Sequence, residues 1–173
     1  SVETGEDAVL VVDKTTFYAR SGGQIGDAGT IECGGFTFQV DDTVKSENGV
    51  YLHSGTVVEG IAKAGEEVEV RIDADRRRSI MRNHTAAHLL QAALEKTLGE
   101  HCHQAGSLVE PDRIRFDFTH FAAMTTEEIS AVENIVNLEI FAGQEGSMSP
   151  MELEEAKKLQ EENGGFIKTM WCG

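Results

Sequence analysis

The chain has 173 residues, of which 40% are hydrophobic and 26% are charged, and this size and composition fit one soluble domain or two small ones. No stretch reaches the roughly 18 consecutive apolar residues that a membrane helix needs, which excludes a membrane-spanning protein. The formal charge of −15 argues against broad affinity for nucleic acids, because Lys and Arg supply the contacts to phosphates. Three cysteines without a disulfide framework favour a reducing, cytoplasmic setting.

The first 72 residues predict an all-β unit. Apolar or alternating runs are separated by Gly, Asp and Asn, which is typical of short antiparallel strands. Phe36, Phe38 and Val40 alternate and therefore share one face of a strand. The segment 20–29 carries four glycines and predicts a loop. We expect a small barrel or sandwich over residues 1–74, with strands near 8–12, 29–31, 36–40, 50–58 and 67–72.

The pattern changes to α+β after a boundary near residues 72–76. Asp73 or Asp75 is placed to cap a long helix that keeps helical apolar spacing to about Leu98. Two strands are expected over 105–109 and 113–118. Thr125 with Glu128 matches a capping box and predicts a helix to about residue 142. A further helix is expected from Ser149, so an α+β core covers 75–173.

The basic residues are concentrated at the start of this core. Residues 71–120 carry 8 basic and 7 acidic groups, whereas residues 1–70 carry 4 basic and 13 acidic groups. Four arginines fall within seven positions: Arg76, Arg77, Arg78 and Arg82. They are either a solvated helix face or a site that meets phosphates.

Two histidines, His84 and His88, lie four residues apart on the predicted long helix. This spacing places both imidazoles on one face, about 6 Å apart along the axis, where they can chelate one ion. The pair is also compatible with two polar residues on a solvated face. Because Thr85 replaces the Glu base of a zinc protease, that activity is disfavoured. A zinc site needs a third ligand, for which the candidates are His101, Cys102, His103, His120 and Cys172.

The glycine-rich loop contains the run Ser21-Gly22-Gly23-Gln24. Glycines let backbone N–H groups approach whatever the loop covers. The same run is equally compatible with a plain tight β-turn. It lacks the Lys-Ser/Thr ending of a P-loop and opens no helix, which disfavours nucleotide binding of that kind.

Taken together, these segments resemble the editing region of alanyl-tRNA synthetases. The family includes the second additional domain of threonyl- and alanyl-tRNA synthetases and the free-standing AlaX-like deacylases. The resemblance covers residues 8–159 in order. It rests on five motifs: Phe17 to Asp27, Asn83 to Leu90, Gln104 to Val109, Arg115 to Phe118, and Met151 to Leu159.

The resemblance implies a small β-barrel before an α+β editing core that hydrolyses serine or glycine wrongly attached to tRNA(Ala). It implies Zn²⁺ as cofactor, with His84 and His88 as ligands. Cys172 is either a third ligand or part of a diverged tail, and the family's final His is absent. The resemblance implies that Gln104 lies in the pocket and that Ser21, Gly22, Gly23 and Gln24 form the loop over it. Gln104, Gln24 and Thr85 are the candidate catalytic residues, since their polar groups can bond a serine hydroxyl. The four arginines are the candidate contacts to acceptor-stem phosphates. The implied partners are the acceptor end of tRNA(Ala) and the rest of a synthetase chain. The net charge of −15 predicts that this chain binds tRNA weakly and in a salt-sensitive way.

Two further interpretations remain open. In the first, the chain is an incomplete editing fragment with a structural role and no zinc. In the second, it is a generic cytoplasmic metal-binding module. Metal content distinguishes the structural fragment, which holds no zinc, from an assembled editing site. A deacylation assay distinguishes the metal-binding module, which binds zinc without hydrolysing the ester, from that editing site.

Overall fold

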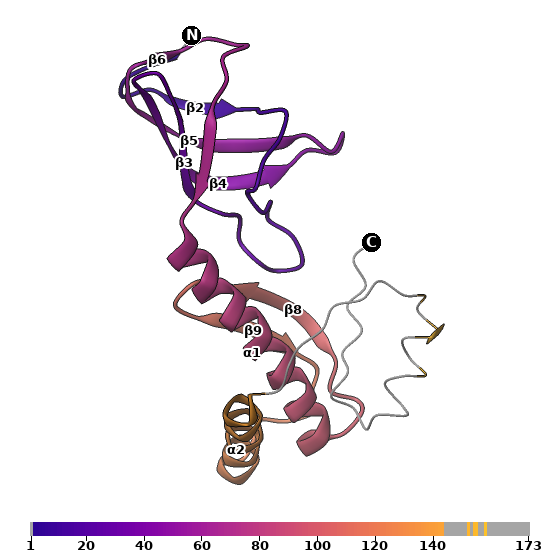
Figure 1. The fold of residues 1–173 in the computed structure, drawn as a ribbon. Coiled ribbons are helices and arrows are strands. Elements are labelled where there is room, and N and C mark those ends of the chain that lie inside the picture. Colours follow the sequence, from indigo (N-terminus) through magenta and orange to yellow (C-terminus); the bar gives the residue numbers. More distant parts are fainter. Residues whose placement is uncertain (1, 144–151, 153, 156–157, 159–173) are drawn as a thin grey trace. The chain divides into compact units, whose positions relative to one another are not determined.

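The computed structural model describes residues 2–143 together with residues 152, 154, 155 and 158. The chain divides into two compact units (Figure 1). Unit 1 comprises Ser1–Asn83 and Leu108–Arg113, and unit 2 comprises His84–Ser107 and Ile114–Gly173. Helix α1 (Ala74–Leu98) and strand β8 (Gln104–Val109) each contribute residues to both units.

Unit 1 is built on a five-stranded antiparallel sheet with the order β2-β5-β4-β3-β7. Its members are β2 (Asp7–Leu10), β3 (Gly29–Cys33), β4 (Phe36–Lys45), β5 (Tyr51–Glu59) and β7 (Glu69–Ile72). A short pair formed by β1 (Val2–Glu3) and β6 (Ile61–Ala62) lies outside this sheet. The expected strands are thus confirmed, and β4 continues five residues beyond the expected end at Val40.

The expected barrel is not confirmed. Strands β2 and β7 stand at opposite edges of the five-stranded sheet, and within residues 2–143 no pairing joins them. The sheet is therefore open in the part of the chain that the structure describes. The coarser expectation of an α+β protein with antiparallel sheets holds.

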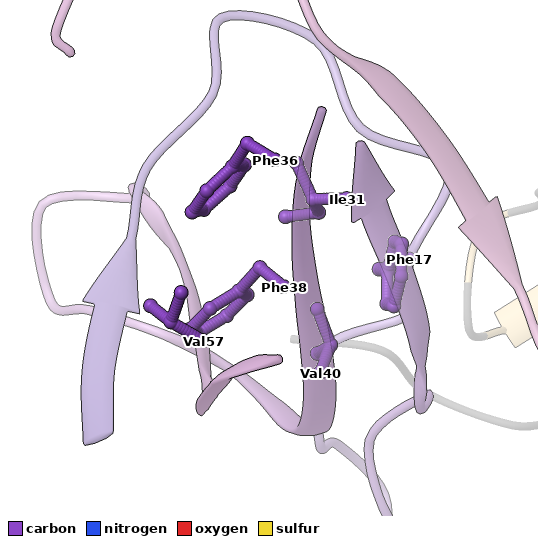
Figure 2. Packing of buried hydrophobic residues seen from close by; sticks show 6 residues of the cluster. All are labelled: Phe17, Ile31, Phe36, Phe38, Val40 and Val57. Atoms are coloured by element: carbon purple, nitrogen blue, oxygen red, sulfur yellow. The ribbon is translucent and has the colours of Figure 1, made fainter. Parts of the chain in front are cut away.

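The core of unit 1 lies on the face of the sheet that the alternation in β4 predicts. Phe36, Phe38 and Val40 are all buried, and Phe38 is completely covered. The phenyl rings of Phe36 and Phe38 are nearly parallel, with their centroids 6.5 Å apart (Figure 2). Buried side chains of Phe17, Ile31 and Val57 complete the cluster (Figure 2). Burial of this aromatic and branched surface is the main stabilising contribution to the unit.

The described part of unit 2 contains the rest of α1, the first part of β8, strand β9 and helix α2 (Thr126–Ala142). Strand β9 runs over Ile114–Phe118. The capping box predicted from Thr125 and Glu128 is present: the Glu128 N–H donates to Thr125 Oγ1, and the Thr125 N–H donates to the Glu128 carboxylate. Hydrogen bonding of the Glu128 carboxylate to Thr125, above all from the Thr125 backbone N–H, holds the pKa of Glu128 below its usual value. A second apolar cluster joins α1 to α2 through Ala93, Leu94, Cys102 and Val132.

Two expectations fall outside the described residues. The helix predicted from Ser149 does so except for isolated positions, and Cys172 does so entirely. No helix among the described residues is long and apolar enough to cross a membrane.

Candidate functional site

The glycine-rich run forms a closed tight turn in unit 1. The Ser21 N–H donates to the Gln24 carbonyl (N···O 3.1 Å), and the Gln24 N–H donates back to the Ser21 carbonyl (2.9 Å). Gly22 and Gly23 have φ values of 56° and 82°, and positive φ at both central positions is the signature of a type I′ turn, which favours glycine. The N–H groups of Gly22 and Gly23 take no part in this pair of hydrogen bonds.

The turn is attached to the end of strand β8. The Val109 N–H donates to the Gly23 carbonyl (N···O 2.8 Å), and the Ile25 N–H donates to the Val109 carbonyl (3.3 Å). The Asn83 side chain of α1 donates to the carbonyl of Glu110, the residue after Val109 (2.7 Å). The turn therefore has a fixed position in unit 1.

Only part of the arginine run is available to an anion. Arg77 donates from Nε to Asp27 Oδ1 (2.8 Å) and from its terminal nitrogen to Asp27 Oδ2. Arg76 donates to the Gly26 carbonyl (2.9 Å). Arg78, with a 60% exposed side chain, pairs with exposed Asp75. Arg82 is also exposed and donates to the Ser79 hydroxyl.

The histidine pair lies in unit 2 on α1, as the helical spacing predicts. The imidazole centroids of His84 and His88 are 5.0 Å apart, with an angle of 29° between the ring planes. Both residues are half-buried. Two ring nitrogens on one helix face fit the first two ligands of a zinc site.

No described residue completes that site. Among the described residues, no three His, Cys, Asp or Glu side chains gather where they could hold a metal ion. His101 and His120 bond to each other instead, with Nε2 and Nδ1 3.0 Å apart. The Cys102 thiol is buried, which raises its pKa. The proposed ligand Cys172 lies outside the described residues, so its role stays a prediction.

The three residues expected in the pocket occupy different elements. Gln24 is buried in the turn of unit 1. Thr85 follows His84 on α1 and is exposed, and Gln104 begins β8, where its amide donates to the Ser107 hydroxyl (3.1 Å). Thr85 and Gln104 belong to unit 2, as the histidine pair does.

Sequence reasoning missed the role of Asp27. Its side chain is 2% exposed, and it bonds to Arg77, fifty positions away in the chain. The only sequence signal was its place at the end of the glycine-rich motif. Asn83, which holds the turn after β8, carried no signal beyond its position next to His84.

Comparisons with known proteins concern the chain as a whole. Residues 1–76 match the family described as tRNA synthetases class II (A). The chain is 50% identical over 157 residues to the alanine–tRNA ligases of Acetivibrio thermocellus and Bordetella pertussis. It is 48% identical over 158 residues to that of Staphylococcus epidermidis. Each alignment covers 91% of this chain and 18% of the relative's length. The chain is thus homologous to a segment of alanine–tRNA ligases and spans less than a fifth of their length.

Proposed function

We propose that the chain is the editing segment of an alanyl-tRNA synthetase and hydrolyses serine or glycine wrongly esterified to tRNA(Ala). The observation that carries this proposal is the His84–His88 pair on one face of α1, with ring centroids 5.0 Å apart. Identity of 50% to alanine–tRNA ligases over 157 residues supports the assignment to that enzyme. Hydrolysis of the misattached amino acid is the part of the function that requires a test.

The reaction is the addition of water to an ester carbonyl. A bond forms between the water oxygen and the carbonyl carbon, the carbonyl oxygen gains negative charge, and the ester C–O bond then breaks. The ribose oxygen leaves as a hydroxyl with one proton of the attacking water, and the other proton is released as the amino acid leaves as a carboxylate. N–H groups fixed in space stabilise such an oxyanion. Gly22 and Gly23 offer two, because the type I′ turn uses the N–H groups of Ser21 and Gln24 and not theirs.

The donor set fits zinc as a partial site. His84 and His88 would supply two imidazole nitrogens, and the remaining ligands would come from residues outside the described part or from water. A zinc ion bound there would supply Lewis acidity. A third protein ligand such as Cys172 would give the set of three that is typical of catalytic zinc.

Selectivity for serine over alanine would follow from buried polar groups. A site that bonds the serine hydroxyl leaves its own polar groups unpaired when alanine enters. Gln24, Thr85 and Gln104 are the candidates, and Gln24 is the buried one. Arg78 and Arg82 are the candidates for contacts with acceptor-stem phosphates, since both are exposed.

The test is zinc content and serine release measured together. The native chain, purified without chelator, is expected to hold about one zinc and to release serine from Ser-tRNA(Ala), because two imidazoles already share one helix face. The His84→Ala/His88→Ala variant is expected to lose both. A native chain that holds no zinc and releases no serine would refute the proposal. It would favour the alternative of a structural fragment.

A further inference from the structure

The glycine-rich turn stands at the tip of a closed loop, and Asp27 closes that loop at its base. The Asp27 N–H donates to the Tyr18 carbonyl (2.9 Å), and the Tyr18 N–H donates back to Asp27 Oδ2 (2.7 Å). The segment 18–27 therefore begins and ends at one bonded pair of residues. The Asp27 carbonyl also accepts a hydrogen bond from the buried Thr43 hydroxyl of β4 (3.1 Å).

Helix α1 secures the same base through two arginines. Arg77 donates to both carboxylate oxygens of Asp27, and its terminal nitrogen also donates to the Thr16 carbonyl (3.2 Å). The Asp27 hydrogen bond raises the pKa of Arg77. Arg76 donates to the carbonyl of Gly26, the residue before Asp27. All of these residues belong to unit 1.

We propose that Asp27 and Arg77 form a clamp that positions the turn at residues 21–24, so that Arg77 is a positioning residue and not a phosphate-binding one. This inference rests on the proposed function for its consequence in the reaction. Its structural part stands on the clamp contacts alone. It assigns the first half of the arginine run to organising the loop, and it leaves Arg78 and Arg82 for contact with an anion.

The physical reason is the geometry of the pair. A guanidinium presents its N–H groups in a planar fork that matches both oxygens of one carboxylate, whereas an ammonium is a point charge on a flexible stem. The Asp27 carboxylate is buried, and it must also accept the Tyr18 N–H. A lysine at position 77 keeps the positive charge but lacks the planar pair of N–H donors of the guanidinium. It would therefore hold the Asp27 carboxylate, and with it the base of the loop, less firmly.

The experiment compares Arg77→Lys with Arg71→Lys in the full chain. Arg71 is a matched control, because it makes the same two-point contact with Glu69 (2.9 and 2.8 Å) on the exposed surface of β7. Asp27→Asn is the second clamp variant, and circular dichroism checks that each protein is folded. Hydrogen–deuterium exchange of peptides covering residues 18–27 reports the loop, and serine release from Ser-tRNA(Ala) gives kcat and KM.

The expected result is faster exchange in residues 18–27 for both clamp variants. A drop in kcat of about tenfold to a hundredfold is expected with little change in KM, the size of effect that misplacement of a site can produce. Arg71→Lys should leave loop exchange and both kinetic constants at wild-type values. Wild-type exchange in residues 18–27 of folded Arg77→Lys would overturn the clamp.

The two proposals fail separately. If the wild-type chain releases no serine, the proposed function fails, and loop exchange still decides whether the clamp exists. If the wild-type chain is active and Arg77→Lys has a loosened loop with unchanged kcat, the positioning role is overturned. Full activity with a firmly held loop in Arg77→Lys would overturn both the clamp and the positioning role.

Discussion

Protonation of His53 should destabilise unit 1 in mild acid. The imidazole is completely covered and packs edge-on against Phe17, with ring centroids 5.2 Å apart. Nδ1 lies 3.1 Å from the Leu10 carbonyl, which can only accept, so Nδ1 carries the proton. Nε2 then accepts from the Thr15 hydroxyl, 2.9 Å away. The neutral ring is thereby fully bonded, and burial lowers its pKa below the ordinary 6.5.

The sign and size of the effect follow from linkage. A histidine whose pKa is lowered by folding contributes stability above its ordinary pKa, and this contribution is lost as the pH falls. As the pH falls, His53 is protonated more readily in the unfolded chain than in the folded unit, where its pKa is lower. Between pH 6 and pH 5 the unfolding free energy should therefore fall, and uptake of one proton limits the loss to at most about 1.4 kcal/mol per pH unit.

The assay compares the native chain with His53→Gln, which cannot titrate. Urea unfolding is followed by circular dichroism at pH 7.5, 6 and 5, and hydrogen–deuterium exchange of β4 and β5 peptides assigns the transition to unit 1. Subtracting the unfolding free energies of the two proteins at each pH removes the contribution of the carboxylates, which titrate in both. Parallel loss of stability in the two proteins from pH 6 to pH 5 would show that protonation of His53 does not destabilise unit 1.

Three further predictions concern the glycine-rich loop, helix α2 and the exposed arginines. Gly26→Ala should lower the unfolding free energy of unit 1 by about 1–3 kcal/mol, because a Cβ there would lie 2.3 Å from the Thr43 carbonyl oxygen. A urea unfolding curve identical to that of the native chain would contradict this. Thr125→Ala should cost about 1 kcal/mol by removing the N-cap of α2, and wild-type exchange of α2 peptides would contradict it. Arg78→Ala/Arg82→Ala should reduce the salt dependence of tRNA binding by about two phosphate contacts, and the same slope as the native chain would exclude both residues from the interface.

The strands of unit 1 could be predicted because alternation decides which side chains are buried. Phe36, Phe38 and Val40 are buried as expected. The pattern breaks at Asp41 and Asp42, yet β4 continues to Lys45, because its pairing with β5 shifts register between Val40 and Asp42. Arg20 pairs with Asp42 there. Whether the edge strands meet is a question of long-range pairing, which alternation does not specify, and this is why the barrel could not be predicted reliably.

Some features of the candidate site could likewise be predicted from the sequence, and others could not. The His84–His88 pair follows from helical periodicity alone, since residues four apart share a face. The glycine pair predicts a tight turn, and the structure has one. The partner of Arg77 could not be predicted, because Asp27 lies fifty positions away and charge patterning does not distinguish a buried ion pair from a solvated cation.

The proposed activity is hydrolysis of the wrong aminoacyl ester, with the right one spared. The most direct measurement is the rate of amino acid release from Ser-tRNA(Ala) beside Ala-tRNA(Ala), with the native chain supplied with zinc and with His84→Ala/His88→Ala as control. We expect the native chain to release serine at least about a hundredfold faster than alanine, as a site built around a hydroxyl should, and the control to release neither. Equal rates for the two esters, or serine release no faster than in the control, would contradict the account.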